Sequence, residues 1–256
     1  MNERRVVITG IGTVNPLGNS VPEYFTNLNN GVSGACPITR FDASLFKTRF
    51  ACEVKDFDPV NFGIDKKEAR KMDLFAQFAM AASIEAVKDS KLDLENEDRD
   101  KIGVIIGSGI GGITTLTLEA MGYSEGGRVP RFNPFMIPKM IPDIAAGLIS
   151  IKFGLRGPNY ATVSACASSV HAMANAFDII RLGRADVVLT GGAEAGISIQ
   201  SVGGFNSAQA LSTRNEDYLT ASRPFDKTRD GFVMGEGSGI LIFEEYERAV
   251  ARGAKI

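Results

Sequence analysis

The sequence has few of the residues that mark secreted or metal-bound proteins, and no excess of either charge. Its three cysteines, Cys36, Cys52 and Cys166, lack CxxC spacing, which argues against a disulfide framework or a metal site and fits a reducing cytoplasm. The 28 basic residues are balanced by 30 acidic ones, so nothing points to nucleic acid or an anionic membrane as partner. No apolar run approaches the roughly 18 residues that span a bilayer. The N-terminus also lacks the apolar core of a signal peptide.

Buried strands and helices alternate along the chain. We predict strands at residues 5–12, 101–107, 160–164, 185–192 and 237–247, and helices after Ser20, from Asp65 to about Ser90, over 166–182 and over 247–253. An apolar helix broken or entered at Pro138 and Pro142 is expected between them. The strand–helix–strand succession from residue 160 to 192 has the length of a parallel crossover. These patterns predict an α/β fold with a mixed, mostly parallel sheet covered by helices.

A glycine motif, Gly107-Ser-Gly109-Ile-Gly111-Gly112, follows the second strand and satisfies GxGxxG. Such a motif opens dinucleotide sites only when a second strand ends in an acidic residue about twenty positions later. No such strand follows here, and neither a phosphate-loop lysine nor a GxSxG elbow occurs. We therefore expect the glycines to serve close backbone packing, and we do not predict a nucleotide cofactor.

Cys166 lies in the segment VSACASSVHA, residues 163–172, between a predicted strand and a predicted helix. A lone cysteine among alanines is most often an inert core residue. Three features favour a nucleophile instead: Ser164 is available to cap a helix that opens at or beside Cys166, the neighbouring side chains are small, and active sites gather at the carboxyl ends of parallel strands. A thiolate beside free backbone N–H groups is suited to acyl transfer.

A catalytic base for Cys166 is missing from these residues. The single histidine, His171, lies five residues further along the same predicted helix, about 140° around its axis. That geometry keeps the ring from the sulfur, and a histidine satisfied by buried hydrogen bonds is the simpler interpretation. The residues alone thus indicate a nucleophile without its catalytic partners.

Five segments together resemble the β-ketoacyl-acyl carrier protein synthases, above all the type II enzymes of bacterial fatty acid synthesis. They are VVITGIGTVNPLG at the N-terminus, VSACASSVHA, GGAEAGIS, ALSTRN and ASRPFDKTRDGFVMGEGSG. The resemblance implies a thiolase-like fold of two pseudo-symmetric α/β halves, usually dimerised through the first half. Residues 1–256 would form the N-terminal half, with the second half absent from this chain.

The resemblance also implies a reaction. Cys166 would carry the growing acyl chain as a thioester, and decarboxylation of malonyl-carrier protein would make the carbanion that attacks it. In the family two histidines and a lysine of the second half assist, and these have no counterpart here. We therefore expect a 3-oxoacyl-(acyl carrier protein) synthase II without a metal or cofactor of its own, the phosphopantetheine being the carrier's, and no condensation by these residues alone. The alternatives are a polyketide-type ketosynthase and a non-catalytic chain-length or partner subunit, against which Cys166 argues.

Further positions are assigned by the same resemblance. Residues expected to line the acyl pocket are Ile110, Met136, Gly196, Ser201 and Phe205. Residues expected to dock the acidic acyl carrier protein are Lys67, Arg70, Lys71 and Arg131. Without the resemblance, the basic run 66–71 is more simply the solvated start of a helix. Gln209 stands where a docking arginine is common in the family.

Overall fold

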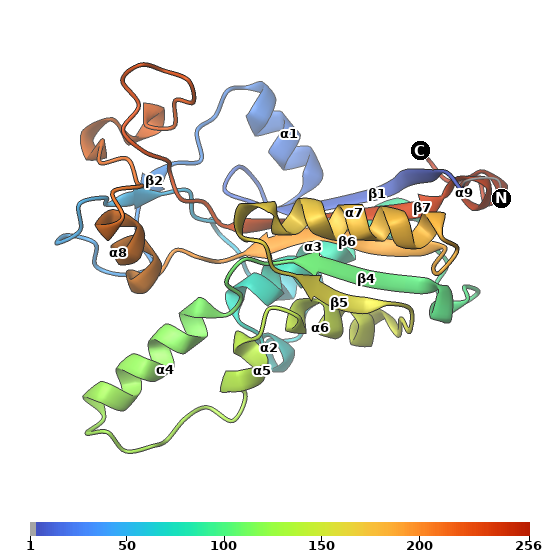
Figure 1. Ribbon diagram of the computed structural model, residues 1–256, viewed down its shortest axis with the longest axis horizontal. Helices are drawn as coiled ribbons and strands as arrows, with labels where there is room; N and C mark the ends of the chain where they lie inside the picture. Colours follow the sequence, from blue (N-terminus) through green and yellow to red (C-terminus); the bar gives the residue numbers. More distant parts are fainter. Residues whose placement is uncertain (1–3) are drawn as a thin grey trace.

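The apolar runs of the sequence form one five-stranded sheet in the computed structural model, which describes residues 4–256 and leaves out the first three residues of the N-terminal segment (Figure 1). In spatial order the strands are β1 (Val6–Val14), β7 (Gly237–Glu245), β6 (Val187–Glu194), β4 (Ile102–Gly107) and β5 (Asn159–Thr162). β4 pairs in parallel with β5 and β6, whereas β7 runs antiparallel to β6 and β1. The mixed α/β sheet is confirmed: β1, β6, β4 and β5 run in one direction and β7 runs against them.

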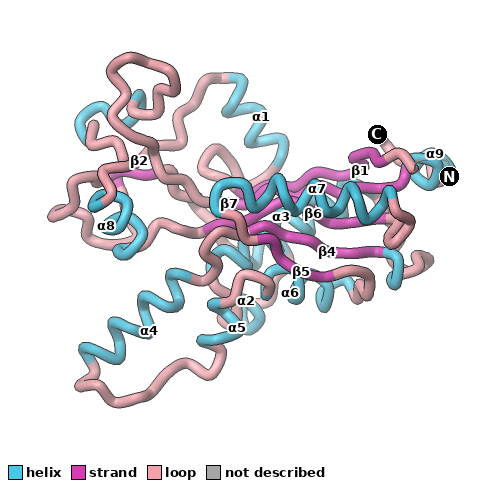
Figure 2. The backbone as a smooth tube through the Cα atoms, viewed as in Figure 1, coloured by secondary structure: helices cyan, strands magenta, loops and turns pink. Residues whose placement is uncertain are grey.

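The direction of β7 follows from the segment between residues 195 and 236. This segment leaves the sheet at the carboxyl end of β6 and returns at the same end, so that Gly237 pairs with Glu194. A strand that re-enters where its neighbour ends must run antiparallel to it. The excursion itself carries α8 (Ile199–Ser207) and a 3-10 turn (Asn215–Thr220), which lie beyond the sheet in Figures 1 and 2.

Helices cover both faces of the sheet. α7 (Ser168–Arg181) lies on one face, and α3 (Leu74–Ser90) with α6 (Ile144–Phe153) lies on the other (Figure 1). β4 is buried throughout because its alternate side chains enter two separate cores. Ile105 packs toward α7 with Val188, whereas Val104 and Ile106 pack toward α3 and α6. The sequence of a central strand that is covered on both faces is typically a continuous run of apolar residues.

The helix expected from Asp65 to Ser90 is two helices, α2 (Lys66–Ala69) and α3. The break lies at Asp73, whose buried carboxylate accepts a hydrogen bond from the N–H of Phe75 and so caps α3. The same carboxylate accepts from the backbone N–H and hydroxyl of Thr115, at 2.8 and 2.5 Å. The prediction of one continuous helix is wrong because this tertiary contact ends the regular backbone at Asp73.

The remaining elements surround this frame. They are α1 (Val21–Asn29), a short hairpin of β2 (Cys36–Pro37) and β3 (Phe50–Ala51), α4 (Ile113–Glu125), α5 (Met136–Met140) and α9 (Tyr246–Ala251), with 3-10 turns at Pro59–Phe62, Arg99–Lys101 and Ala165–Ala167. Ser20 caps α1 as predicted. Pro142 lies between α5 and α6, where the predicted helix breaks, whereas Pro138 lies within α5. No helix within residues 4–256 combines the length and apolarity needed to cross a bilayer.

Carboxylates of α3 complete the outer edge of the sheet. β1 is an edge strand, and the N–H of Thr13 donates to Glu85 at 2.8 Å while that of Ile11 donates to Asp89 at 3.0 Å. Glu85 also accepts from the N–H of Val21, at 2.8 Å, where α1 begins. Side chains that occupy edge N–H groups remove the template for pairing with another chain.

The most deeply buried charge is Glu244 on β7. Its side chain is fully buried and receives two hydrogen bonds from Arg252, both at 2.7 Å, and one from the hydroxyl of Thr9, also at 2.7 Å. Arg248 pairs with Glu244 and with Glu97. Burial acts to raise the pKa of the Glu244 carboxyl, but the bonds from Arg252 and Thr9 outweigh it and hold the pKa below the ordinary 4.5.

We expect Glu244→Gln to lower the free energy of unfolding by about 3 kcal/mol at neutral pH. This value is at the lower end of the range for breaking a buried ion pair, because Arg248 still pairs with Glu97 in the variant. A carboxyl whose pKa is lowered by folding contributes stability above its unfolded pKa of 4.5 and loses that contribution as the pH falls through the folded pKa. Urea unfolding from pH 7 to pH 3 should therefore show a smaller pH slope in the variant. Equal slopes would contradict the assignment. Glu247→Gln, at an exposed pair with Arg5, is the matched control and should leave stability unchanged.

Candidate active site

Cys166 lies exposed in the 3-10 turn Ala165–Ala167, between the end of β5 and the start of α7. The strand-to-helix junction is confirmed, but the helix begins at Ser168, two residues after the cysteine. Ser164 does not cap α7 as expected, because its hydroxyl pairs with His171 instead. Cys166 thus belongs to a separate turn that precedes the helix.

This turn is sharp and is fastened by Ser168. Ala165 adopts a left-handed backbone with φ of +51°, a conformation that costs a non-glycine residue about 1–2 kcal/mol. The Ser168 hydroxyl donates to the carbonyl of Ala165 at 2.7 Å and accepts from the N–H of Ser164 at 2.9 Å. The hydroxyl of Thr162 donates to the Ser168 carbonyl at 2.7 Å. These bonds hold the backbone in the unfavourable conformation that turns Cys166 outward.

His171 is part of the same fastening. Its Nδ1 lies 2.6 Å from the hydroxyl oxygen of Ser164. The ring is exposed, so the prediction of a buried, satisfied histidine is wrong in its burial but correct in giving the ring a hydrogen-bond partner. The bond engages the ring with the turn and not with the sulfur, which agrees with the helical geometry.

Glycines make the junction possible. A Cβ atom on Gly107, at the end of β4, would lie 2.4 Å from the carbonyl carbon of Ser168. A Cβ on Gly192, in β6, would lie 2.7 Å from the Cβ of Ser169. The first turn of α7 therefore rests directly on the carboxyl-end segments of both strands, where ligand sites of parallel sheets form.

The glycine motif after β4 closes around a carboxylate of the chain itself. Glu194, the last residue of β6, accepts hydrogen bonds from the N–H of Gly109 at 2.6 Å and of Ile110 at 3.2 Å. The hydroxyl of Ser108 donates to its other oxygen at 3.3 Å. Burial raises the pKa of this carboxyl, although the hydrogen bonds act in the opposite direction. The N–H groups that would bind a phosphate are occupied, so the motif serves packing as predicted.

Glu194 was not singled out from the sequence. Its only signal there is position, because it directly ends the buried run VVLTGGA at the carboxyl end of a predicted strand. The loop that it holds reaches the cysteine turn: a Cβ on Gly109 would lie 3.6 Å from the carbonyl oxygen of Ala165. The carboxylate therefore joins β6, the loop 108–111 and the cysteine turn.

The residues predicted to line an acyl pocket lie on three neighbouring segments. Ile110 is in the loop after β4, Met136 opens α5, Gly196 follows β6, and Ser201 and Phe205 are in α8. Gly196 is buried but has space: a Cβ there would meet only the methyl of Met234 and Glu194 Cγ, at 3.8 and 3.9 Å. The Phe205 ring lies edge-on against Phe232 at 5.2 Å, a contact that does not involve Cys166.

The residues predicted to dock a carrier protein are all exposed. Lys67 is in α2, Arg70 and Lys71 directly follow it, and Arg131 is in the loop between α4 and α5. The Lys71 ammonium lies 5.5 Å from the centre of the Phe135 ring, which precedes α5. This contact brings the basic segment beside the helix that Met136 opens.

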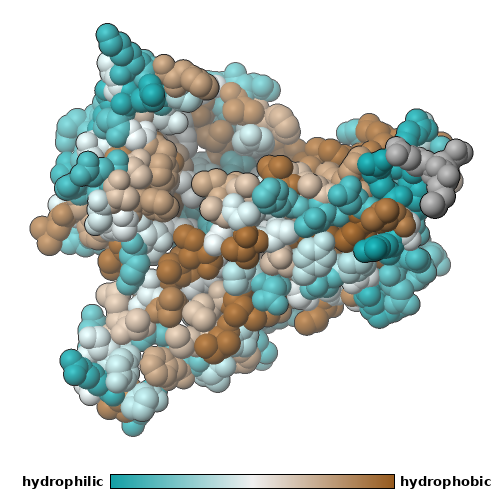
Figure 3. Space-filling view, in the orientation of Figure 1, coloured by the Kyte–Doolittle hydropathy of each residue, from teal (hydrophilic) through white to brown (hydrophobic). Residues whose placement is uncertain are grey.

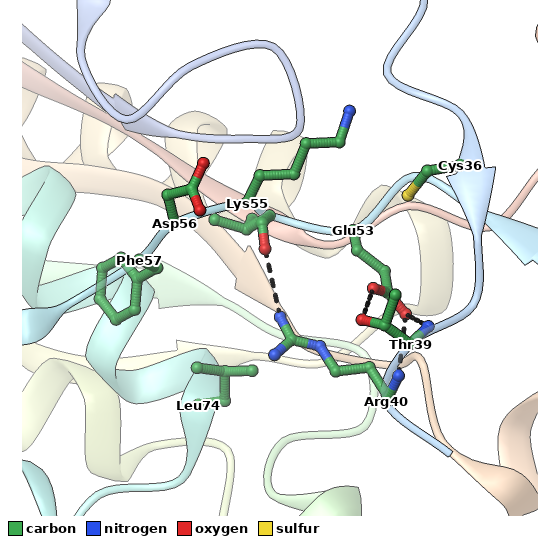
Figure 4. A pocket seen from close by; sticks show the side chains of 9 residues that line it. Cys36, Thr39, Arg40, Glu53, Lys55, Asp56, Phe57 and Leu74 are labelled. Atoms are coloured by element: carbon green, nitrogen blue, oxygen red, sulfur yellow. Dashed lines mark hydrogen bonds between the residues drawn. The ribbon is translucent and has the colours of Figure 1, made fainter. Parts of the chain in front are cut away.

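A pocket of about 480 Å³ lies elsewhere, beside the β2–β3 hairpin (Figure 4). Its nine lining residues include none of the predicted site residues. Glu53 accepts from the N–H and hydroxyl of Thr39, and the guanidinium of Arg40 donates to the carbonyl of Val54 at 3.4 Å (Figure 4). Glu53 and Arg40 thus bind uncharged groups of the chain, and we assign the pocket no ligand.

Comparisons with known proteins point to one family. The family model described as Beta-ketoacyl synthase, N-terminal domain matches residues 3–249. A curated relative, the 3-oxoacyl-[acyl-carrier-protein] synthase 2 of Synechocystis, is 51% identical over the whole chain, which covers 61% of that protein. The solved ishigamide ketosynthase/chain length factor superposes with a TM-score of 0.92 at 32% identity, over 99% of this chain and 61% of that one.

A second solved structure is described as a type II PKS acyl-carrier protein in complex with its ketosynthase bound to the hexaketide. It matches all of this chain and 61% of its own, at 32% identity and a TM-score of 0.88. The chain spans about 60% of the length of the curated relatives that it matches. The likeness therefore covers the portion of these proteins that the family model calls N-terminal.

We expect Gly107→Ala to destabilise the chain by about 1–3 kcal/mol, because its Cβ would collide with the backbone of Ser168 beneath the cysteine turn. Gly147→Ala in α6 is the matched control: nothing lies within 4 Å of the added atom, and a helical alanine should gain about 0.5–1 kcal/mol. Urea unfolding measures both. Equal effects of the two substitutions would show that α7 does not rest on β4.

Proposed function

Because the chain belongs to the beta-ketoacyl synthase family, we propose that it is the cysteine-bearing portion of a 3-oxoacyl-(acyl carrier protein) synthase of fatty acid biosynthesis. The observation that carries the proposal is the exposed Cys166, held on a fastened turn at the carboxyl ends of β4, β5 and β6. The 51% identity to a 3-oxoacyl-[acyl-carrier-protein] synthase 2 supports the choice of pathway. The free thiols of Cys36, Cys52 and Cys166 suit the cytoplasm.

The first step that we propose is acyl transfer. The Cys166 thiolate attacks the carbonyl of an acyl thioester on carrier protein, and the carrier's phosphopantetheine sulfur leaves and takes up a proton. In the second step malonyl-carrier protein loses carbon dioxide, and the resulting carbanion attacks the Cys166 thioester. The Cys166 thiolate then leaves, and the product is a 3-oxoacyl chain longer by two carbons.

We propose that these residues carry the group needed for the first step and lack groups for the second. Acyl transfer needs an accessible nucleophile, and Cys166 is exposed among small side chains. Decarboxylation needs groups that stabilise a carbanion as it forms. The family resemblance assigns this role to two histidines and a lysine of a second half, whereas these residues hold one histidine, bound to Ser164. We propose that condensation requires residues other than these 256.

Substrate and partner surfaces complete the proposal. The space beside buried Gly196 supports an acyl pocket formed with Ile110, Met136, Ser201 and Phe205. The exposed cations Lys67, Arg70, Lys71 and Arg131 support docking of an acidic carrier protein. The solved relative that is a ketosynthase in complex with its acyl-carrier protein supports the same partner.

We also propose that the whole enzyme is a homodimer. The α4–α5 region carries exposed apolar side chains, including Leu118, Phe135 and Ile137. Figure 1 shows α4 extending away from the sheet, and Figure 3 shows apolar side chains exposed between α4 and α7. Apolar surface of this kind is typical of a contact between subunits.

A polyketide-type ketosynthase is the second candidate, because two solved structures that superpose well belong to a ketosynthase/chain length factor and to a type II PKS complex. Their identity of 32% is well below the 51% shared with the fatty acid enzyme. A non-catalytic chain-length subunit is disfavoured by Cys166, since such subunits generally lack the cysteine. Product analysis of the whole enzyme with malonyl-carrier protein distinguishes one elongation from repeated ones.

We expect the chain to take an acyl group from acyl-carrier protein on Cys166 and to form no measurable 3-oxoacyl product. Loss of one positioned acid–base group typically costs about a hundred- to ten-thousand-fold in rate, and two are missing here. Intact-mass and peptide mass spectrometry measure acylation, and chromatography measures product. Cys166→Ala should abolish acylation, whereas Cys52→Ala, the control at another free thiol, should preserve it. Condensation by the chain alone, or acylation of Cys166→Ala, would refute the assignment.

We expect Arg70→Glu to weaken acyl carrier protein binding about fivefold or more, because it replaces attraction to an acidic partner by repulsion at an exposed site. The difference should shrink with added salt, since exposed charges are screened beyond about 8 Å at physiological ionic strength. A titration at low and high salt measures it. Arg184→Glu, at an exposed residue before the amino end of β6, is the control. Equal affinities of wild type and Arg70→Glu at low salt would remove the docking assignment.

A further inference from the structure

One carboxylate organises a whole loop beside the nucleophile. Glu194 Oε2 accepts from two consecutive N–H groups, those of Gly109 and Ile110, and its Oε1 accepts from the hydroxyl of Ser108. The Ser108 hydroxyl oxygen in turn accepts from the N–H of Gly111 at 3.1 Å. All four residues of the loop 108–111 are thereby tied, directly or through Ser108, to one side chain.

The carboxylate is fixed, whereas the loop has no regular structure of its own. Glu194 is the last residue of β6, a central strand paired with β4 on one side and with Gly237 of β7 on the other. The loop follows the end of β4 and forms no helix or strand until α4 begins at Ile113. Without the carboxylate, the N–H groups of half-buried Gly109 and exposed Ile110 would lose their acceptor, so the loop would move rather than the strand.

The loop abuts both the cysteine turn and the end of α5. A Cβ on Gly109 would stand 3.6 Å from the Ala165 carbonyl oxygen, next to Cys166. A Cβ on Gly111 would stand 2.7 Å from the carbonyl oxygen of Met140 at the end of α5. Ile110 lies between these contacts, with its N–H fixed by Glu194 and its side chain nearly half exposed.

We propose that Glu194 is a positioning residue that sets which acyl chains reach Cys166, by holding the loop 108–111 so that Ile110 has one place beside the nucleophile. The selectivity in this proposal rests on the function proposed above. Glu194 touches neither Cys166 nor the acyl chain, and acts only through the loop.

The side chain at 194 acts through its acceptor atoms and its shape. A glutamine supplies an oxygen for the N–H groups of Gly109 and Ile110, and its amide can donate to the hydroxyl of Ser108, which is both donor and acceptor. An alanine supplies neither. Glu194→Gln should therefore retain the loop, and Glu194→Ala should release it.

The first test measures the loop itself in the 256-residue chain by hydrogen–deuterium exchange of the Gly109 and Ile110 amides. Loss of a hydrogen bond to a charged group typically favours opening about tenfold or more. We expect that acceleration in Glu194→Ala and near wild-type exchange in Glu194→Gln. Glu85→Ala is the matched control: that carboxylate also accepts two backbone N–H groups, but at β1 and α1, and its loss should accelerate Thr13 and Val21 only.

The second test measures selectivity as the ratio of Cys166 acylation rates with acetyl and decanoyl thioesters of N-acetylcysteamine. We expect Glu194→Ala to change this ratio at least about threefold, through the concentration of decanoyl thioester that gives half-maximal rate, while Glu194→Gln and Glu85→Ala keep the wild-type ratio. A general loss of folding would lower both rates alike. Gly109→Ala, whose Cβ would stand 3.0 Å from Glu194 Oε2, should shift the ratio without removing the carboxylate.

Unchanged amide exchange, or an unchanged ratio, in Glu194→Ala would overturn the proposal, and so would a glutamine variant that behaves like the alanine variant. If wild-type chain takes up neither acyl group on Cys166, the proposed function fails instead. The exchange measurement then still decides whether Glu194 holds the loop, because it needs no substrate.

Discussion

The direct contact between the first turn of α7 and the sheet is the constraint on which the site depends. β4 and β6 are parallel neighbours, and Gly107 and Gly192 leave no side chain between them and residues 168–169. Ser168 can therefore bond both Ala165 and Ser164, and that clasp forces Ala165 into its left-handed backbone. The exposure of Cys166 is thus a consequence of two glycines in strands remote from it in sequence.

Carboxylates that accept backbone N–H groups provide a second kind of order in this chain. Glu85, Asp73 and Glu194 each accept backbone N–H groups that the regular elements leave without a partner. Each stands on or caps a rigid element and binds N–H groups of another segment: the β1 edge, the start of α4, and the loop beside Cys166. Burying an N–H group without an acceptor is costly, so these carboxylates allow irregular backbone to pack closely against the rest of the chain. Glu244 differs, because its partners are arginines and a hydroxyl.

The sequence predicts well what local patterns determine. The continuous apolar run of β4 and the cap at Ser20 are local signals, and the structure agrees with both. The break at Asp73 escaped prediction because its partner, Thr115, lies 42 residues further along the chain. The direction of β7 likewise depends on where the excursion after Glu194 re-enters the sheet, which no local pattern encodes.

The residues around Cys166 show the same difference between local patterns, which can be predicted, and long-range contacts, which cannot. The position of Cys166 between a strand and a helix could be predicted from the sequence. The left-handed backbone of Ala165 could not be predicted, because alanine carries no sequence signal for that conformation and only the hydrogen bonds of Ser168 impose it. Glu194 was missed because a glutamate that binds a loop 85 residues earlier looks like any polar residue after a strand.

The division of labour within the proposed reaction follows from this geometry. Hydroxyls and glycines hold the turn that carries Cys166, and the ring of His171 bonds to Ser164 of that turn and not to the sulfur. A group that accepts an acyl chain has to be held in place, whereas a group that donates protons has to be able to move. The turn holds Cys166 in place and leaves one side of it open to solvent. On the proposed function, the groups that stabilise the carbanion must approach from that open side, so that the acylated cysteine need not move between the two steps.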